Sequence, residues 1–407
     1  MRPNWLHALA ILGASAATCP ADTPPRFERV VIDDDFPGGY QVEVADVNGD
    51  GKPDLIGVGG GTCAWYENPS WTKRVVTTPR ETPEIISSAT ADLDGDGKAE
   101  IALAYDFAMN TPARGKLLLA VQGARPDDPW ALRPVADVPS IHRLRWGWIP
   151  VAPLVGPNSI VFKKKLELVV APIFGPSARP PSFDQEPAHL TLFSTGSDPR
   201  SGRWESMAIG QAPVLHAIEV IDSGVDGSSA ILGASNLGVT STLCLGNGLD
   251  PFVRTEVLNA GAPGSAPKRG ASEVHLGRLK DGRRLLATVE PWHGTDVAVY
   301  LSESLNPLKF GPRAVIETTL NEGHALWVAD VDGDGDDEVF AGSRGSGGGV
   351  LMFDFNGKTW DRTEVDRAIA AQDLRGGDLD GDGRPDVVAI GGKTHNVVWY
   401  RPIRPAK

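Results

Sequence analysis

The sequence predicts an all-β fold, a single seven-bladed β-propeller, and three observations lead to this prediction. Four acidic nonapeptides recur along the 407 residues, and each is followed by an apolar run typical of a strand. Within the first pair and within the last pair, the repeats start 46 and 48 residues apart, a period that suits a blade of four short strands. The 47 glycines and 33 prolines favour many turns over long helices.

Each nonapeptide follows the pattern Asp-x-(Asp/Asn)-Gly-Asp-Gly-x-x-(Asp/Glu), with oxygen-bearing side chains at positions 1, 3, 5 and 9. A tight loop with this spacing can surround a hard cation with oxygen atoms, and position 7 adds its backbone carbonyl. We therefore expect about four structural Ca²⁺ ions, one in each loop. The predicted ligand positions are Asp46, Asn48, Asp50, Lys52, Asp54, Asp92, Asp94, Asp96, Lys98, Glu100, Asp330, Asp332, Asp334, Asp336, Glu338, Asp378, Asp380, Asp382, Arg384 and Asp386.

Three worn copies of the repeat lie between the second and third nonapeptides. They begin at His142, His216 and Ser272, and their loops have lost some or nearly all of the ligand side chains. In the first of them the loop is expected to be replaced by a longer insertion that reaches a solvated turn at 163–165. Four intact and three worn copies predict seven blades.

The two ends of the repeat region suggest how the ring closes. After the last nonapeptide the chain has room for two strands, 387–390 and 397–400, and one further strand, 27–32, precedes the first nonapeptide. We expect that strand to complete the last blade, so that the propeller spans 26–402 and leaves no open sheet edge.

The N-terminal sequence and the net charge limit where the protein acts and which partners it has. Residues 1–21 are typical of a signal peptide, since Arg2 precedes an apolar run and small residues, and we expect a secreted or periplasmic protein. Anchoring through Cys19 as a lipoprotein is the less favoured alternative. No later run is apolar for eighteen residues, so no membrane span is expected. The net charge of −13 argues against nucleic acid and anionic membranes as partners.

Three histidines occupy one repeat position, six residues before the start of a loop: His142, His216 and His324. Six residues of strand span roughly 20 Å, so these side chains should lie at the opposite end of the innermost strands, around the mouth of the axis. His293 is expected on the same rim. Clustered imidazoles can hold a divalent transition metal with an open position, or act as general base and acid near neutral pH, and both possibilities remain open.

Other side chains on this rim are candidates for binding a sugar. Tyr40 occupies the same repeat position as the histidines, and its ring, like those of Trp146 and Trp292, could stack on a sugar. Arg344 and Glu84 are expected nearby. A long loop, 175–189, is expected to cover part of the pocket as a lid.

On these motifs the chain resembles the FG-GAP/VCBS repeat family of calcium-loop propellers over about residues 26–402. It is also similar to the propeller domains of the aldos-2-ulose dehydratase family. This second resemblance rests on four short motifs, at 142–146, 168–175, 289–294 and 321–330. The cupin domain of the fungal enzymes has no counterpart here.

The second resemblance implies a lyase or dehydratase that performs β-elimination on a keto-sugar or anhydro-keto-sugar. One of His142, His216, His293 or His324 would then remove the proton beside the carbonyl, and Arg143 or a bound divalent ion would hold the enolate. The alternative is a non-catalytic propeller that binds a glycan or a protein partner. The expected partner is a small sugar or oligosaccharide in the first case, and fold alone does not decide between the two.

Overall fold

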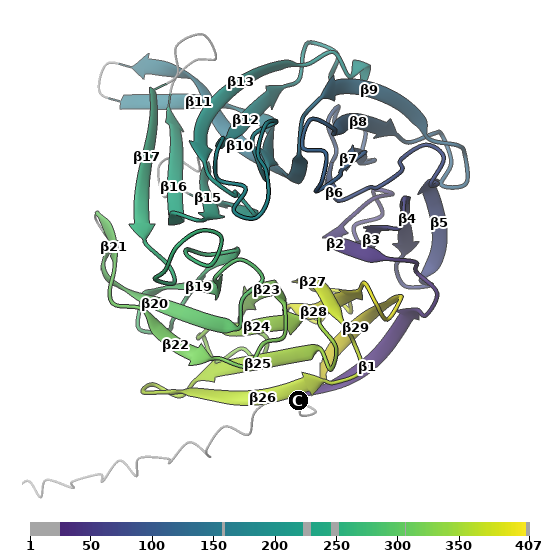
Figure 1. Cartoon of the computed structure of the whole chain (residues 1–407). Coiled ribbons are helices and arrows are strands. Elements are labelled where there is room, and N and C mark those ends of the chain that lie inside the picture. Colours follow the sequence, from purple (N-terminus) through teal and green to yellow (C-terminus); the bar gives the residue numbers. More distant parts are fainter. Residues whose placement is uncertain (1–24, 157–158, 223–228, 246–251, 306, 404–407) are drawn as a thin grey trace, which may run out of the picture.

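The computed structural model describes residues 25–156, 159–222, 229–245, 252–305 and 307–403. Within these ranges the chain forms seven antiparallel β-sheets arranged as the blades of a ring (Figure 1). The predicted all-β, seven-bladed propeller is thus confirmed. The expected signal peptide, with Cys19, lies outside the described residues.

The first four blades follow one another along the chain. Blade 1 consists of β2 (Gly39–Ala45), β3 (Asp54–Gly59), β4 (Thr62–Glu67) and β5 (Thr72–Thr77). Blade 2 consists of β6 (Ser87–Ala91), β7 (Glu100–Tyr105), β8 (Lys116–Val121) and β9 (Ala131–Asp137). Blade 3 consists of β10 (Ile141–Gly156), β11 (Ser159–Pro172), β12 (Ala188–Ser194), the short 3-10 helix η1 (Pro199–Ser201) and β13 (Glu205–Ala212). Blade 4 consists of β14 (Ala217–Asp222), β15 (Ser229–Ser235), β16 (Gly238–Leu245) and β17 (Phe252–Asn259).

The remaining blades complete the circle. Blade 5 consists of β18 (Glu273–Arg278), β19 (Arg284–Glu290), β20 (Asp296–Leu305) and β22 (Ala314–Glu317), with β21 (Leu308–Phe310) as a further strand on β20. Blade 6 consists of β23 (Gly323–Ala329), β24 (Glu338–Ser343), β25 (Gly349–Phe355) and β26 (Trp360–Asp366). Blade 7 consists of β27 (Ala371–Gly377), β28 (Asp386–Gly391), β29 (Asn396–Ile403) and β1 (Arg26–Asp33).

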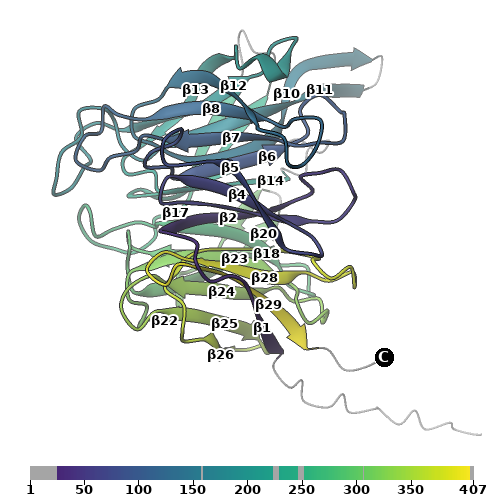
Figure 2. The ribbon, with the colours of Figure 1, turned by 90° about the vertical axis from the view of Figure 1, so that its right-hand side faces the viewer.

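The outermost strand of blade 7 is the N-terminal strand β1, which pairs antiparallel with β29. Arg26 lies opposite Ile403, so the first and last described strands share one end of the ladder. In the edge view the two strands lie side by side at the same margin of the molecule (Figure 2).

The second strand of an intact blade is covered on both faces. All residues of β3, β24 and β28 are buried, because the neighbouring blades pack against both sides of each sheet. Strands buried on both faces are typically continuous apolar runs, as these are. The outermost strands β5 and β26 each have three exposed residues and carry charged side chains.

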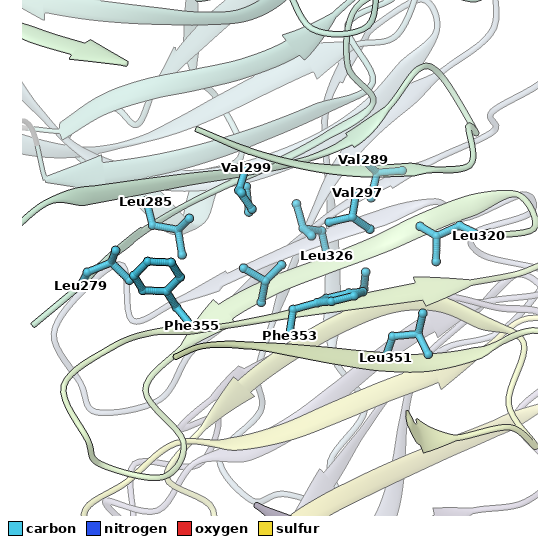
Figure 3. Packing of buried hydrophobic residues seen from close by; sticks show 13 residues of the cluster. Leu279, Leu285, Val289, Val297, Val299, Leu320, Leu326, Leu351, Phe353 and Phe355 are labelled. Carbon is cyan, nitrogen blue, oxygen red and sulfur yellow. The ribbon is translucent and has the colours of Figure 1, made fainter. Parts of the chain in front are cut away.

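The cores lie between blades. One cluster joins blades 5 and 6, where Leu285 and Val299 face Leu326 and Phe353 (Figure 3). Phe353 has no exposed surface. Interlocking clusters of this kind hold each blade against the next.

Blade 3 differs from the expectation at 142–172. Instead of a loop insertion, β10 and β11 form one long hairpin, and Lys163–Lys165 lie in β11 rather than in a solvated turn. The ladder accommodates the local proline through a register shift between Pro150 and Ala152. Strand pairing therefore continues through the segment where a loop insertion was expected.

Two further findings concern the described residues as a whole. Among the described residues no helix has the length and apolar character needed to cross a membrane. Cys63 and Cys244 are both buried free thiols.

Candidate functional site

Four histidines from four blades gather near the axis. His142 lies in β10, His216 directly precedes β14, His324 lies in β23, and His293 lies in the loop between β19 and β20. His216, His293 and His324 each place one ring nitrogen within 4.8 Å of a ring nitrogen of the other two. The ring centroids of His142 and His216 are 4.9 Å apart.

Three of these rings are oriented by the same backbone contact. Nδ1 of His142 lies 2.9 Å from the carbonyl oxygen of His216, and Nδ1 of His216 lies 2.9 Å from that of Ser272. Nδ1 of His324 lies 2.7 Å from the carbonyl oxygen of Gln372. Each acceptor occupies the equivalent repeat position of the next blade. Since a carbonyl accepts, Nδ1 carries the proton in all three rings and Nε2 presents a lone pair.

The Nε2 atoms have different surroundings. Nε2 of His142 accepts from the Tyr40 hydroxyl at 3.0 Å and from Arg143 at 3.2 Å. Among the described residues, Nε2 of His324 has only a long contact, 3.4 Å, from the side-chain amide of Gln372. The Nε2 lone pair of His324 is therefore less engaged in hydrogen bonds than that of His142.

His293 is held in the opposite tautomer. Arg344 Nη2 lies 3.0 Å from Nδ1 of His293, and a guanidinium can only donate, so Nδ1 accepts and Nε2 carries the proton. That Nε2 lies 3.1 Å from Nε2 of His216. His293 thus donates to His216 while Arg344 remains in place.

The imidazoles are neutral at physiological pH. Burial lowers the pKa of His142, His216 and His324 well below the usual range, and the charge of Arg143 or Arg344 lowers it further. Burial followed by the neighbouring His216 and Arg344 also lowers the pKa of His293. Neutral imidazoles act as lone-pair donors, either to a proton or to a metal.

One acidic residue of the site was not predicted from the sequence. Glu273 Oε1 lies 2.9 Å from Nδ1 of His216, and the Arg143 guanidinium is 3.9 Å from the same carboxylate. Burial raises the pKa of Glu273, and Arg143 opposes that rise. The sequence feature that could have identified Glu273 is its position: it directly follows Ser272, which occupies the repeat position of the three histidines.

Aromatic side chains form one wall of the site. Phe183, in the predicted lid, stacks on Phe174 at 4.4 Å, and Trp292 contacts both rings. Trp292 is buried and its ring centroid lies 5.1 Å from that of His293, so it packs against the imidazole and does not present an open face. Phe107, also missed from the sequence, lies 5.8 Å from His142.

The structure brings some predicted sugar-binding residues together and leaves others apart. Tyr40 contacts His142 and His324 with its ring edge, and Arg344 contacts His293. Trp146 is directed elsewhere: its indole N–H donates to the Ala89 carbonyl and its ring packs on Trp204. The side chain of Glu84 is exposed and does not join the imidazoles.

The acidic loops lie between the first and second strands of blades 1, 2, 6 and 7, at the other end of the inner strands. Their glycines at positions 4 and 6 all have positive φ, from 73° to 94°, which a side chain would strain. One oxygen of the position-9 carboxylate caps the loop in every case, as Glu338 accepts from Val331 N–H at 2.8 Å.

Two of these loops fit a hard cation well. Asp330, Asp332 and Glu338 each offer an oxygen within 4.8 Å of the others, as do Asp378, Asp380 and Asp386. The second oxygens of Glu338 and Asp386 are buried and have no hydrogen-bond partner among the described residues. Burial raises the pKa of Glu338 to about 10 and that of Asp386 to about 7, and the neighbouring carboxylates of each loop raise both further.

Comparisons with known proteins agree with the fold. A model of the FG-GAP-like repeat matches residues 46–103 and 330–389. Aldos-2-ulose dehydratase of Phanerodontia chrysosporium is 23% identical over 361 residues, which cover 79% of this chain and 38% of that protein. The chain therefore spans less than half the length of this relative.

Solved structures share the architecture at low identity. BBS1N, in its complex with ARL6DN, matches with a TM-score of 0.51 at 13% identity, covering 92% of this chain and 96% of that one. An Agrocybe aegerita lectin described as recognising non-reducing terminal N-acetylglucosamine has a TM-score of 0.49 at 16% identity, covering 82% and 81%. The likeness to BBS1N concerns the fold alone.

Proposed function

We propose that this chain, a seven-bladed β-propeller with FG-GAP-like repeats, is a carbohydrate lyase or dehydratase that performs β-elimination on a keto-sugar or anhydro-keto-sugar. The observation that carries the proposal is the convergence of His216, His293 and His324, from three blades, with ring nitrogens within 4.8 Å. The distant similarity to aldos-2-ulose dehydratase supports the substrate class.

The chemistry starts from the acidity of a C–H bond beside a ketone. A neutral imidazole takes that proton, the C–H electrons form a C=C bond, and the carbonyl oxygen takes up negative charge. The ketone then re-forms, the enolate C=C electrons make a new double bond to the next carbon, and the oxygen on that carbon leaves with its bonding electrons and receives a proton. In this scheme His324 is the base, because its Nε2 pair is the less engaged.

The charges around the site suit such an intermediate. Arg143 and Arg344 border the imidazoles, and fixed guanidinium donors stabilise developing negative charge on oxygen. Tyr40 donates to His142 in the structure, so this pair can return a proton to the leaving oxygen. Arg143, stacked over the Tyr40 ring at 5.3 Å, holds the pair in place.

The imidazole cluster also fits a divalent transition metal. His216 and His324 already present Nε2 pairs whose Nδ1–H groups are held by backbone carbonyls, the usual support of metal-bound histidine. His293 would complete the set once Arg344 releases its Nδ1. A bound metal would take the Nε2 pair of His324, so it is the alternative to His324 as the base, and it would polarise the ketone and lower the energy of the enolate.

Calcium and export belong to the same proposal. Ca²⁺ in the acidic loops would neutralise carboxylates that repel one another and would stabilise the folded ring. Export, which the N-terminal sequence predicts, would place the protein where calcium is abundant. Neither feature enters the chemical step, because the loops lie at the far end of the inner strands.

The test is turnover of a small panel of oxidised sugars. We expect the protein to convert an aldos-2-ulose, 1,5-anhydrofructose or a 3-keto-glycoside to an unsaturated ketone, followed by its absorbance. His216→Ala and His324→Ala should lose about 100-fold or more in rate. The matched control is His189→Ala, which removes an exposed imidazole at the start of β12.

Either of two results contradicts the enzyme. Unchanged turnover in both variants would show that the imidazoles are not catalytic. No turnover of any sugar in the panel, with binding of the same sugars retained in a calorimeter, would favour the non-catalytic glycan-binding alternative.

A further inference from the structure

The four acidic loops differ at one oxygen atom, the second carboxylate oxygen of position 9. In the loops at 330–338 and 378–386 this oxygen is buried and has no hydrogen-bond partner among the described residues. In the loop at 46–54 it accepts the backbone N–H of Asn68 at 2.8 Å. In the loop at 92–100 it faces a positive charge, since Glu100 Oε1 lies 3.2 Å from Arg200 Nε.

Arg200 belongs to a different blade. It lies in η1, between β12 and β13 of blade 3, and Asp198 caps the first turn. Its guanidinium contacts three carboxylates of the second loop, with Nη1 at 2.7 Å from Asp94 and 3.5 Å from Asp96. These residues and Glu100 are positions 3, 5 and 9 of the loop. The guanidinium therefore contacts three of the four carboxylates that would otherwise surround a metal, all except Asp92.

The grouping of the ligand atoms also differs among the loops. In the loops of blades 6 and 7, the close group of carboxylates consists of positions 1, 3 and 9. In the second loop, the close group consists of Asp92, Asp94 and Asp96, which are positions 1, 3 and 5. Glu100 is 1% exposed and is engaged by Arg200 instead.

We propose that Arg200 is a built-in cation of the second loop, so that this loop is neutralised without calcium and takes up the ion only when the guanidinium is displaced. Ca²⁺ would need oxygens from the same carboxylates at about 2.3–2.6 Å. It would then lie close to the guanidinium, and two like charges at that separation repel strongly. The second loop should consequently bind calcium more weakly than the loops of blades 6 and 7.

Lys280 contacts the carboxylates of the loop at 330–338 less completely than Arg200 contacts those of the second loop. Lys280 Nζ lies 2.8 Å from both Asp334 and Asp336 in the loop of blade 6, but its side chain is 54% exposed. It leaves the buried second oxygen of Glu338 without a partner among the described residues. Lys280 therefore covers the rim of its loop, whereas Arg200 reaches the ninth position.

The first experiment compares Arg200→Gln with the full-length wild-type chain by equilibrium dialysis against a series of free Ca²⁺ concentrations. We expect the variant to bind one ion per chain more tightly, by about tenfold or more, with the other sites unchanged. The matched control is Arg203→Gln, which removes the same charge from an exposed position three residues away. Identical calcium binding curves for wild type and Arg200→Gln would overturn the proposal.

A second measurement needs no variant and so does not depend on the variant's folding. Crystals of the wild-type chain grown with Tb³⁺ would show each occupied loop by anomalous scattering. We expect ions in the loops at 330–338 and 378–386 and none at 92–100, where Arg200 should contact Glu100. A fully occupied ion in the second loop, with Arg200 still on its carboxylates, would refute the proposal whatever the catalytic function is.

Discussion

The Nε2 atoms of His216 and His293 lie 3.1 Å apart, although the residues are 77 positions apart in the sequence and come from neighbouring blades. Only one hydrogen can lie between two neutral ring nitrogens. Arg344 decides which ring supplies it, because its contact at Nδ1 of His293 places the proton on Nε2 of that ring. The arginine therefore controls how many imidazole lone pairs face the centre of the site.

Arg344→Gln should increase the affinity of the imidazole cluster for a divalent transition metal. Without the guanidinium, Nδ1 of His293 can carry the proton and its Nε2 can join His216 and His324 as a ligand. We expect Co²⁺ binding to tighten by about tenfold, followed by its visible absorption during titration. Arg367→Gln, at a side chain that is 82% exposed, is the charge-matched control. Equal Co²⁺ affinity in all three proteins would contradict this role of Arg344.

Chelation of calcium should lower the thermal stability of the protein. A ligand present at about a hundred times its Kd stabilises the folded state by about 2.7 kcal/mol for each site. Glu338→Gln removes one metal-facing oxygen charge and should reduce the shift in Tm that EDTA causes. The control is Asp281→Asn in the worn loop of blade 5, which should respond to EDTA as the wild type does. If EDTA leaves the wild-type Tm unchanged, calcium is not structural here.

The contact between blades 6 and 7 should make a pH-dependent contribution to the free energy of unfolding. Asp366 accepts from the Tyr400 hydroxyl at 2.7 Å and from Arg29 at 2.8 Å, and so joins blade 6 to blade 7. Burial alone would raise the pKa of Asp366, but the backbone N–H of Ala368, Arg29 and Tyr400 outweigh burial and hold it below 3.8. A lowered pKa in the folded state means that the stabilisation is complete above 3.8 and is lost as the pH falls through the folded-state value.

Asp366→Asn should accordingly cost about 1–3 kcal/mol of unfolding free energy at pH 7, and the difference from wild type should shrink below pH 3.8. Urea unfolding between pH 7 and pH 3 measures both quantities. Asp34→Asn, at an exposed position next to β1, should match the wild type throughout. If the loss of unfolding free energy in Asp366→Asn stays constant down to pH 3, the ionised carboxylate does not stabilise the contact between blades 6 and 7.

The core between blades 5 and 6 should tolerate little loss of volume. Phe353→Ala leaves a cavity among fully buried neighbours and should cost about 3–5 kcal/mol in urea unfolding. Val315→Ala, at a side chain that is 39% exposed on the outermost strand of blade 5, should change stability by less than about 0.5 kcal/mol. Similar costs for both variants would mean that the blades do not depend on this cluster.

The sequence was most informative where one motif fixed both a turn and its neighbouring strands. The nonapeptide at 46–54 needs two glycines with positive φ and is followed by a strand, so each copy marks the first hairpin of a blade. Counting these copies, worn ones included, predicted seven blades. The repeat position of His142, His216 and His324 then placed them at a common depth on the inner strands.

The sequence was least informative where contacts depend on segments that the repeat does not govern. Phe183 reaches Trp292 through the path of the long loop of blade 3, and no spacing rule describes that path. Glu273 reaches His216 only because blades 4 and 5 are adjacent. A loop insertion was predicted after His142 because the acidic loop is missing from that copy, whereas β10 and β11 continue to pair through a register shift between Pro150 and Ala152.

The pairing of Arg26 with Ile403 has a mechanical consequence. Both ends of the described chain leave from the same end of the β1–β29 ladder, so a force that separates them loads the terminal hydrogen bonds first and breaks the rungs one after another. Such an unzipping geometry yields at a lower force than shearing of a whole strand. Tension between attached neighbours would therefore peel β1 away and expose the edge of β29 while the other six blades stay folded.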